Sequence, residues 1–455
     1  MTEPPDDLES AHDEGPGTTE SATAGPGIAG VVLLPGLAVW RRWPVVGALL
    51  FIAGIIAPAF VLLMVVENRN DLVGLFTRPA VLRGTALVAV FGVFSRFIAV
   101  WLTSDRVRDV DEQRRMRLVG TGLVALLMVP TTFAIVRMEQ ARSVVKSVFQ
   151  QDSQHGQVKA VGGLDPNADQ FETVLMMGSD EGADRLGLRT DSMIIAFVHK
   201  ATGHTTLVSV PRNLTNVHFP PGTPLAGKYP NGFDDLVNAI YTRVNEYPSL
   251  KAAYSKGGTD PGITALMEGL SYSLGITIND YVMVNSCAFV RIVDAVGGVK
   301  IYVDKKLPMP AVLRCSAYRL TPTIGPGLIN MDGTKALGYV RSRKADSDYY
   351  RMQRQRTLIQ AIAKQIGIGT LLAHFGELAD VVKADVRTSM TVQEARSLMT
   401  TLQAGGGKFV SVGLVPPIVE PGHPDYNSLK AYIQKLRATT AAGLPAPTVP
   451  TTAKS

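Results

Sequence analysis

The chain has 455 residues, a formal net charge of +6, 46% hydrophobic residues and only 18% charged residues. This length allows more than one domain, and the positive mean hydropathy of +0.15 is typical of a protein that is partly embedded in a membrane. The two cysteines, Cys287 and Cys315, do not have the spacing of a metal site, which argues against cysteine-based metal binding.

The chain begins with a polar segment and then becomes strongly apolar. Residues 1–26 contain seven acidic residues and neither Lys nor Arg, which predicts a disordered acidic tail. Residues 27–136 form the predicted membrane region. Within it, residues 27–40 are apolar but are interrupted by Pro35-Gly36, and they are shorter than the roughly 20 residues that a span needs. We therefore expect this short stretch to be interfacial or re-entrant.

Three longer apolar stretches predict transmembrane helices at residues 44–66, 84–103 and 118–136. The second stretch contains Arg96. This side chain either extends to the nearer, C-terminal interface or has a buried ionic partner. The prediction of three spans depends on the insertion of this second helix in spite of its arginine.

The loop between the second and third stretches is basic. Its arginines are Arg106, Arg108, Arg114, Arg115 and Arg117, and Arg41 and Arg42 precede the first stretch. The positive-inside rule places both basic segments on the cytoplasmic side. The acidic tail is then cytoplasmic as well, and three spans place everything after about residue 137 outside the cell, beginning with a polar linker at 137–170.

Residues 171–438 have the pattern of a soluble domain. Short apolar runs bounded by turn residues predict strands at 173–177, 192–199, 205–210, 281–285, 299–303 and 409–415. Helical periodicity predicts helices near 234–246, 248–256, 262–274, 288–296, 332–340, 348–367 and 391–403. This alternation predicts an α/β or α+β sandwich around a central sheet. The Ala/Pro/Thr-rich residues 439–455 are predicted to form a disordered tail.

The loop that joins the first two strands of this domain has charged residues at its ends. Asp180 follows the first strand, Arg189 and Asp191 precede the second, and Arg212 follows the third. Two carboxylates and two guanidiniums around one loop suit a divalent cation together with a phosphate group. An ordinary solvated loop with surface ion pairs is the alternative.

A second candidate site is the basic cluster between residues 341 and 356. Arg341 and Arg343 alternate, so they point to the same side of an extended chain, and Arg351 and Gln355 share one face of a helix. Arginine binds phosphate oxygens in two-point fashion, so several arginines together suit a pyrophosphate. A solvated basic helix is the alternative, and the lack of a recognisable nucleic-acid-binding module argues against nucleic acid.

The two cysteines fall in the domain that we place outside the membrane. A disulfide between Cys287 and Cys315 would tie the Pro-rich segment 307–330 to the helix at 288–296, and an oxidising compartment favours it. Two buried free thiols are the alternative.

The order of several motifs between residues 174 and 362 resembles the LytR-CpsA-Psr family of cell-wall ligases. The motifs are Gly178-Ser179-Asp180, Arg189-Thr190-Asp191, Pro211-Arg212, Asn238-Ala239-Ile240-Tyr241, Gly257-Gly258, Leu274-Gly275-Ile276, Asp280-Tyr281-Val282, Val293-Asp294-Ala295-Val296-Gly297-Gly298-Val299, Met331-Asp332-Gly333, Ala336-Leu337-Gly338-Tyr339-Val340-Arg341-Ser342-Arg343, and Asp348, Arg351 and Gln355. The resemblance implies an extracellular α/β domain of this family's type, an α-β-α sandwich around a central mixed sheet that follows a membrane anchor.

The resemblance also implies a phosphotransferase. It would move a glycopolymer from a polyprenyl pyrophosphate carrier to a hydroxyl of peptidoglycan and form a phosphodiester. The family pattern assigns Mg²⁺ (or Mn²⁺) to Asp180 and Asp191. It assigns the catalytic grip on the pyrophosphate to Arg189, Arg212, Arg341 and Arg343, acceptor positioning or deprotonation to Asp348, and head-group binding to Arg351 and Gln355.

Two positions depart from the family pattern. Asn213 stands where the family often has Asp, and Leu236 stands where Lys is common, but neither change touches the expected metal carboxylates. Two other functions stay open. One is a membrane-anchored pyrophosphatase that uses the same site with water as the acceptor, and the other is a non-catalytic envelope regulator that only binds the lipid pyrophosphate.

Overall fold

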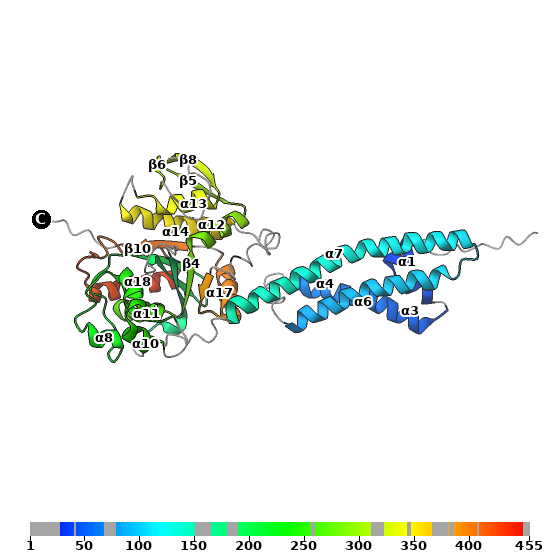
Figure 1. Ribbon diagram of the computed structural model, residues 1–455, viewed down its shortest axis with the longest axis horizontal. Coiled ribbons are helices and arrows are strands. Elements are labelled where there is room, and N and C mark those ends of the chain that lie inside the picture. Colours follow the sequence, from blue (N-terminus) through cyan, green and yellow to red (C-terminus); the bar gives the residue numbers. More distant parts are fainter. Residues whose placement is uncertain are drawn as a thin grey trace, which may run out of the picture. The chain divides into compact units, whose positions relative to one another are not determined.

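A computed structural model of the chain describes residues 28–40, 42–67, 79–150, 165–179, 190–255, 260–310, 323–343, 347–365, 381, 386–406 and 409–448 (Figure 1). The chain divides into two compact units. One holds the N-terminal helices up to Ile135, and the other holds the domain that follows.

The described part of the N-terminal unit is helical. Its elements are α1 (Ile28–Leu33), α2 (Leu37–Trp40), α3 (Pro44–Phe51), the π-helix η1 (Ile52–Ile56), α4 (Ala57–Glu67), and the greater part of α6 (Pro79–Ser104) and of α7 (Val110–Gln150), from Leu82 and up to Ile135 respectively. Among the described residues, three stretches are long and apolar enough to cross a membrane: Pro44–Met64, Arg83–Ser104 and Val110–Phe133. Each of these stretches overlaps one of the three predicted from the sequence, and the third begins eight residues before the predicted 118–136.

The short apolar stretch before the first span folds as a helical hairpin. Helices α1 and α2 have six and four residues, so neither can cross a bilayer alone. The turn between them needs a glycine, because Gly36 has φ +103° and a Cβ there would lie 2.3 Å from the carbonyl oxygen of Gly47. Val31 and Val39 are buried in one cluster with Val100 of α6 and Val124 of α7. The hairpin is therefore packed on the helices of the candidate spans.

The second unit is built on a six-stranded mixed sheet with the strand order β10-β3-β2-β1-β4-β9. The strands are β1 (Phe171–Ser179), β2 (Thr190–His199), β3 (Thr205–Val210), β4 (Asp280–Asn285), β9 (Val386–Thr388) and β10 (Phe409–Gly413). The β1–β2, β2–β3 and β4–β9 pairs are antiparallel, whereas β1–β4 and β10–β3 are parallel. Long helical connections lead to β4 and β10, as parallel pairing requires.

Helices cover both faces of this sheet. On one face, Leu175 and Ile195 share a core with α8 (Pro224–Lys228), the 3-10 turn η3 (Val237–Ala239), α9 (Ile240–Glu246), α10 (Pro248–Tyr254), α11 (Pro261–Leu274) and α18 (Tyr426–Ala441). On the other face, Val174 and Ile194 pack against α14 (Asp348–Gln365) and α17 (Val392–Ala404). Because neighbouring strand residues point to opposite faces and both faces are covered, the predicted α-β-α sandwich is confirmed.

A smaller group of elements follows β4. It consists of α12 (Ser286–Ala295), the ribbon of β5 (Val299–Val303) and β8 (Gly327–Met331), the two-residue strands β6 (Leu307–Pro308) and β7 (Thr323–Ile324), and α13 (Gly333–Arg341). These elements share a second core with Leu358 of α14. Gly333 lets α13 approach α12 closely, because a Cβ there would lie 2.1 Å from the carbonyl oxygen of Val290. The C-terminal end of α13 is thereby placed beside α14.

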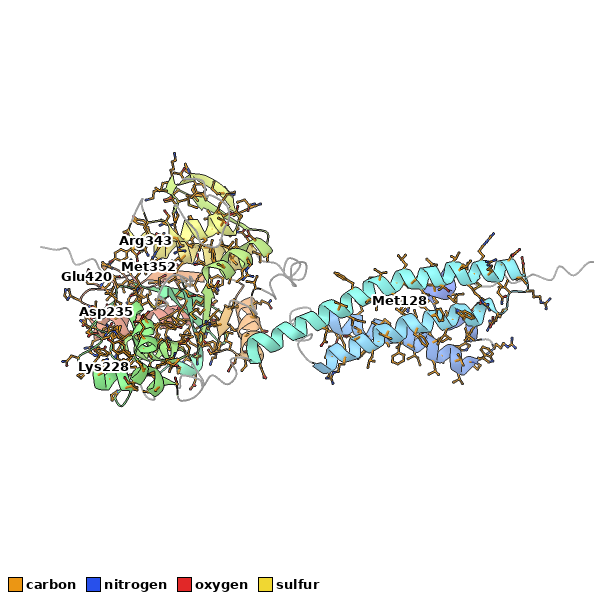
Figure 2. All side chains as sticks on the ribbon, viewed as in Figure 1. Met128, Lys228, Asp235, Arg343, Met352 and Glu420 are labelled. Carbon is orange, nitrogen blue, oxygen red and sulfur yellow. The ribbon has the colours of Figure 1, made fainter. Side chains whose placement is uncertain are left out.

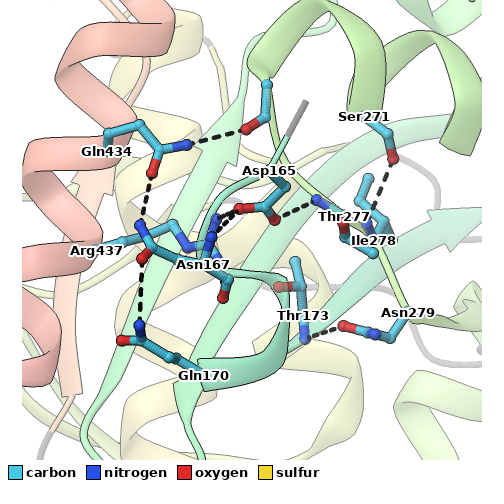
Figure 3. Close-up of polar contacts among 11 residues, drawn as sticks. Asp165, Asn167, Gln170, Thr173, Ser271, Thr277, Ile278, Asn279, Gln434 and Arg437 are labelled. Carbon is cyan, nitrogen blue, oxygen red and sulfur yellow. Dashed lines mark hydrogen bonds and ion pairs between the residues drawn. The ribbon is translucent and has the colours of Figure 1, made fainter. Parts of the chain in front are cut away.

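A buried polar network joins the entry of the domain to its last helix (Figure 3). Asp165, just before the short 3-10 turn η2 (Ala168–Gln170), forms an ion pair with Arg437 of α18, and their side chains are 3% and 0% exposed. Asp165 also accepts a hydrogen bond from the Thr277 N–H (2.7 Å), and Arg437 donates to the Asn167 carbonyl (2.8 Å). This network fixes the start of the domain on α18.

Some predicted segments differ from the structure or lie outside the described residues. Helix α7 extends to Gln150, so the first part of the predicted linker at 137–170 is helical. Helix α18 extends to Ala441, three residues into the segment predicted as a disordered tail from residue 439. The acidic tail at 1–26, the linker residues 151–164 and the last residues, 449–455, lie outside the described part of the chain.

Candidate functional site

Three guanidiniums converge on one carboxylate at the N-terminal end of α14. Arg351 Nη2 lies 3.0 Å from Asp348 Oδ2, Arg212 Nε lies 3.6 Å from the same oxygen, and Arg343 Nε lies 3.5 Å from Oδ1. Arg212 comes from the turn after β3, Arg343 from the segment after α13 (labelled in Figure 2), and Arg351 from α14 itself. The structure thus brings together four of the residues that the sequence had assigned to the site. We call them the Asp348 cluster.

The turn after β3 places Arg212. In this turn the Leu214 N–H donates to the Pro211 carbonyl (3.1 Å), and the Asn238 N–H donates to the Arg212 carbonyl (3.4 Å). Leu214 is fully buried in the main core. The backbone is therefore held in place while the Arg212 side chain, which is 33% exposed, reaches Asp348 at the surface.

The segment after α13 is held by a buried arginine of α14. Arg354 donates from Nε to the carbonyl of Tyr339 (3.1 Å) and from Nη2 to the carbonyl of Ser342. Arg354 belongs to the predicted basic cluster, but it serves here to bind the end of a helix whose last carbonyls lack helical partners. This contact fixes the position of Arg341, the last residue of α13, and of Arg343.

Gln355 connects α14 to the strand that carries one of the expected metal ligands. Its Nε2 donates to Ser192 Oγ of β2 at 2.6 Å. Asp191 precedes Ser192 at an irregularity of the β1–β2 pairing, where Ser192 is opposite Gly178 but Thr190 is opposite Ser179. Bulges of this kind redirect side chains and are frequent beside functional sites.

Several predicted site residues are not fully described. Asp180 and Arg189 lie outside the described residues, and only the backbone of Asp191 is described, so the metal ligands stay a prediction. Among the described residues, no group of three or more His, Cys, Asp or Glu side chains is placed to hold a metal ion. Cys287 is disulfide-bonded, but its predicted partner Cys315 lies outside the described part of the chain.

Sequence reasoning did not assign Arg356 to the site. This buried side chain donates from Nε to Ser411 Oγ (2.6 Å) and from Nη1 to Ser209 Oγ (2.7 Å). Burial lowers the pKa of Arg356 to about 10. Ser209 is on β3, three residues before Arg212, so Arg356 fastens α14 to the strand that leads to Arg212. The helical period of the sequence was a usable signal, because Arg356 is one helical turn after the apolar Met352 and shares its face.

More guanidiniums than carboxylates make up the four side chains of the Asp348 cluster. Three guanidiniums and one carboxylate have a net formal charge of +2. Arg343 is 42% exposed, so a ligand from solvent can reach the cluster. The guanidinium fork matches the paired oxygens of a phosphate, and charge-assisted hydrogen bonds of this type are stronger than neutral ones. The arrangement suits a phosphate or pyrophosphate group.

The chain is similar to known proteins over much of its length. A family model with the description LytR_cpsA_psr family matches residues 133–412. Biofilm regulatory protein A of Streptococcus mutans is 28% identical over 232 residues, which are 49% of this chain and 51% of that protein. Polyisoprenyl-teichoic acid–peptidoglycan teichoic acid transferase TagU of Bacillus mycoides is 28% identical over 221 residues, or 48% of this chain and 60% of that protein. The chain thus spans 51% to 60% of the length of these two relatives.

Another relative and two solved structures are also similar. TagU of Oceanobacillus iheyensis is 27% identical over 286 residues, which are 62% of this chain and 78% of that protein. The crystal structure of Bacillus subtilis TagV covers 61% of this chain and 99% of its own, with a TM-score of 0.42 and 21% identity. The structure of TagT bound to LIIa-WTA covers 63% of this chain and 96% of its own, with a TM-score of 0.40 and 22% identity.

Proposed function

The chain belongs to the LytR-CpsA-Psr family, and we propose that it is a membrane-anchored phosphotransferase that attaches a glycopolymer to peptidoglycan. The donor in this proposal is the glycopolymer on a polyprenyl pyrophosphate, and the acceptor is a hydroxyl group of peptidoglycan. Two relatives support this reaction class, because their names describe the transfer of a polyisoprenyl-linked teichoic acid to peptidoglycan.

The observation that carries the proposal is the Asp348 cluster. Phosphoryl transfer is catalysed mainly by positioning and by neutralisation of charge on the transferring group. Arg212, Arg343 and Arg351 supply that positive charge from three separate segments. Arginine suits this role better than lysine, because its planar fork contacts two phosphate oxygens at once.

The proposed step exchanges one phosphorus–oxygen bond for another. The oxygen of the acceptor hydroxyl attacks the phosphorus that carries the glycopolymer. The bond from this phosphorus to the bridging oxygen breaks, and polyprenyl monophosphate leaves with the electron pair. The hydroxyl proton passes to a base. The donor already contains a phosphoanhydride, so the reaction needs no nucleotide outside the cell.

Asp348 acts as a positioning residue in this scheme. Its two oxygens are shared among the three guanidiniums, so it aligns them before the donor arrives. Gln355, through Ser192, keeps α14 in register with β2. Arg189 and Arg341 complete the grip on the pyrophosphate by the family pattern.

A divalent cation belongs to the proposal as well. Asp180 and Asp191 would hold Mg²⁺, since carboxylate oxygens are its usual protein ligands. The backbone supports this assignment at one point, because Asp191 lies at the irregular pairing between β1 and β2, next to the residue that Gln355 binds. When bound, the cation would neutralise charge on the pyrophosphate.

The proposed location of the domain is outside the cell. Three candidate spans, with an arginine-rich connection between α6 and α7, favour this orientation by the positive-inside rule. The disulfide at Cys287 supports it, because disulfides persist in oxidising compartments.

The proposal is tested with the purified full-length chain in lipid nanodiscs. The chain is incubated with Mg²⁺, an oligosaccharide on polyprenyl pyrophosphate and nascent peptidoglycan strands, and the products are analysed by mass spectrometry. We expect a phosphodiester-linked conjugate and released polyprenyl monophosphate, and we expect both to disappear when EDTA removes the cation.

Other outcomes assign the chain to the other candidate functions. If the donor is cleaved but none of several acceptors yields a conjugate, the chain is a pyrophosphatase. Tight binding of the lipid pyrophosphate without cleavage would identify a non-catalytic regulator, a role that the name of the Streptococcus mutans relative also suggests.

A further inference from the structure

Arg96 lies in the second candidate span, and its side chain points to the middle of that span. Its Nη1 donates to the Gly92 carbonyl at 2.7 Å, one turn toward the N-terminal end of α6. Gly92 is 9 residues from Arg83 and 12 residues from Ser104, the ends of the span. At about 1.5 Å per residue, the guanidinium therefore lies roughly 14 Å from one end and roughly 18 Å from the other. It does not extend to the nearer, C-terminal interface, which was one of the two expectations from the sequence.

The first span is irregular at the same depth. A Cβ on Gly92 would lie 3.5 Å from the Ala53 carbonyl oxygen, 3.6 Å from Pro58 Cγ and 3.6 Å from Arg96 Nη1. Ala53 belongs to the π-helix η1, and Pro58 has no N–H to donate back along the helix. π-Helical turns of this type are often found at functional sites. A backbone carbonyl of the first span, that of Ala53, and the Arg96 guanidinium of the second span therefore both lie beside Gly92.

The hairpin of α1 and α2 reaches this level as well. A Cβ on Gly54 would lie 2.3 Å from Pro35 Cγ, at the tip of the hairpin, and 2.7 Å from Ser95 Oγ of α6. Ser95 Oγ donates to the same Gly92 carbonyl that accepts from Arg96. Non-helical backbone is tolerated at membrane depth where protein buries it or where it lines a polar cavity. In membrane proteins, broken helices at mid-depth are typical of substrate and ion sites.

The charge of Arg96 has no acidic partner in these two spans. Neither Pro44–Met64 nor Arg83–Ser104 contains an Asp or Glu. Among the described residues, the only acceptor for the Arg96 guanidinium is the Gly92 carbonyl, which leaves most of its five N–H groups for other acceptors. A cation within the hydrocarbon region is costly, and such residues usually mark a ligand or ion pathway.

We propose that Arg96 is a membrane-embedded binding site for the phosphate group of a lipid. The guanidinium fork supplies two-point recognition of phosphate oxygens, and the lipid tail places the anion beside a residue that water-soluble anions do not reach. Two sources have this chemistry, a polyprenyl phosphate and an anionic phospholipid. The choice of polyprenyl phosphate rests on the proposed function, because that lipid is the product released by the transfer reaction.

The test measures lipid binding by the full-length chain that carries Arg343→Gln, which weakens phosphate binding at the Asp348 cluster. Native mass spectrometry follows titrations with polyprenyl monophosphate, the uncharged polyprenol and phosphatidylglycerol. We expect Arg96→Gln to weaken binding of polyprenyl monophosphate at least about tenfold, the equivalent of one charge-assisted contact, and to leave polyprenol binding unchanged. The matched control is Arg83→Gln, which removes an exposed arginine from the end of the same span. It should bind like the parent chain.

The remaining outcomes are equally decisive. Equal affinity of the Arg96→Gln and parent chains for both anionic lipids overturns the proposal, as does equal binding of polyprenol and its phosphate. A lower melting temperature of Arg96→Gln with unchanged affinity also overturns it and assigns Arg96 a structural role. Selective binding of phosphatidylglycerol supports the site with a phospholipid as its ligand. Transfer activity is assayed separately in the chain with native Arg343, so a failed transfer reaction counts against the proposed function alone.

Discussion

Two carboxylates of the second unit bind arginine in opposite ways. Asp165 has one guanidinium partner, Arg437, and the pair is almost completely buried. Asp348 has three, from Arg212, Arg343 and Arg351, and it is 28% exposed. In the first pair the charges cancel, and the Arg437 guanidinium packs on the ring of Phe171, with a distance of 4.5 Å to the ring centroid. In the Asp348 cluster the four side chains have a net formal charge of +2, and the Arg212 and Arg343 side chains are 33% and 42% exposed.

The difference shows how the same two residue types serve structure in one place and ligand binding in another. A buried ion pair whose charges cancel has no net charge to attract a ligand. Removing one of its partners leaves an uncompensated charge in the core. Solvent screens the ion pairs of the two exposed arginines, Arg212 and Arg343, so these pairs add little to stability, but both guanidiniums are accessible to an anion. Stability and activity should therefore respond to different arginines.

The largest effect is expected from the buried pair. Asp165→Ala removes one partner and leaves the Arg437 charge buried, which costs about 3–5 kcal/mol of unfolding free energy. Urea denaturation of the full-length chain, followed by the fluorescence of its aromatic residues, measures this loss. Transfer activity per folded molecule should stay within about twofold of the wild type, since the pair does not touch the site.

A double variant sharpens this test. Asp165→Leu combined with Arg437→Leu removes both charges together, and we expect it to recover much of the stability that Asp165→Ala loses. If Asp165→Ala unfolds like the wild type, the pair does not hold the domain entry on α18. The contrast with the Asp348 cluster would then be wrong.

The second largest effect concerns Arg343. Arg343→Gln removes one exposed guanidinium of the Asp348 cluster, and transfer activity should fall about 100- to 1,000-fold, as for the loss of one charge-stabilising donor. The unfolding free energy should change by less than about 0.5 kcal/mol. Initial rates of conjugate formation and urea denaturation measure the two quantities in parallel.

Lys335→Gln is the matched control for Arg343→Gln. Lys335 is on α13, the helix that leads to Arg343, and its ammonium pairs with Asp332 at 3.0 Å on the surface. Lys335→Gln should change the rate by less than about twofold and the unfolding free energy by less than about 0.5 kcal/mol. Similar losses of activity in both variants would mean that general surface charge, and not the Asp348 cluster, drives the reaction.

Much of the fold could be predicted from the sequence, because most helices and strands have regularly spaced apolar residues and are bounded by turn or capping residues. The runs at 192–199 and 205–210 match β2 and β3, and α17 begins at a capping box formed by Thr391 and Glu394. Helix α18 was not predicted, although Asp425 caps its start and Leu429 and Ile433 face the core. Its Ala- and Thr-rich end has the composition of a tail, and tertiary packing overrides that local signal.

The site could be predicted residue by residue but not as an assembly. Arg212 and Asp348 are distant in the chain and meet because α14 packs across the sheet. No sequence pattern around either residue indicates that contact. The Asp165–Arg437 pair was not predicted at all, because a buried ion pair between distant segments has no period or spacing in the sequence.

A smaller effect is expected from Asp348 itself. Asp348→Asn keeps the shape of the side chain but removes the charge that aligns three guanidiniums, so activity should fall about 10- to 100-fold. If Asp348 only positions the arginines, the shape of the pH–rate profile should be unchanged. The loss of an ionisation from this profile, together with near-complete loss of activity, would instead identify Asp348 as the general base.

The smallest effect concerns a third carboxyl, one that has no cation among its described contacts. Asp280 is buried at the start of β4 and accepts a hydrogen bond from Ser389 Oγ at 2.7 Å. Burial raises its pKa to about 6, and the neighbouring Glu394 and Glu172 add to this shift. The native state therefore holds this proton more tightly than the unfolded chain does. Its contribution to stability is present below about pH 4 and is lost as the pH rises through about 6.

Asp280→Asn tests this sign, because asparagine imitates the neutral carboxyl at every pH. Between pH 4 and 7 the wild type should lose about 1–2 kcal/mol of unfolding free energy relative to the variant. Urea denaturation at pH 4, 5, 6 and 7 measures the difference between the two curves. Parallel curves would show that Asp280 ionises equally in both states, and that a buried carboxyl in this domain does not need an arginine to keep its charge.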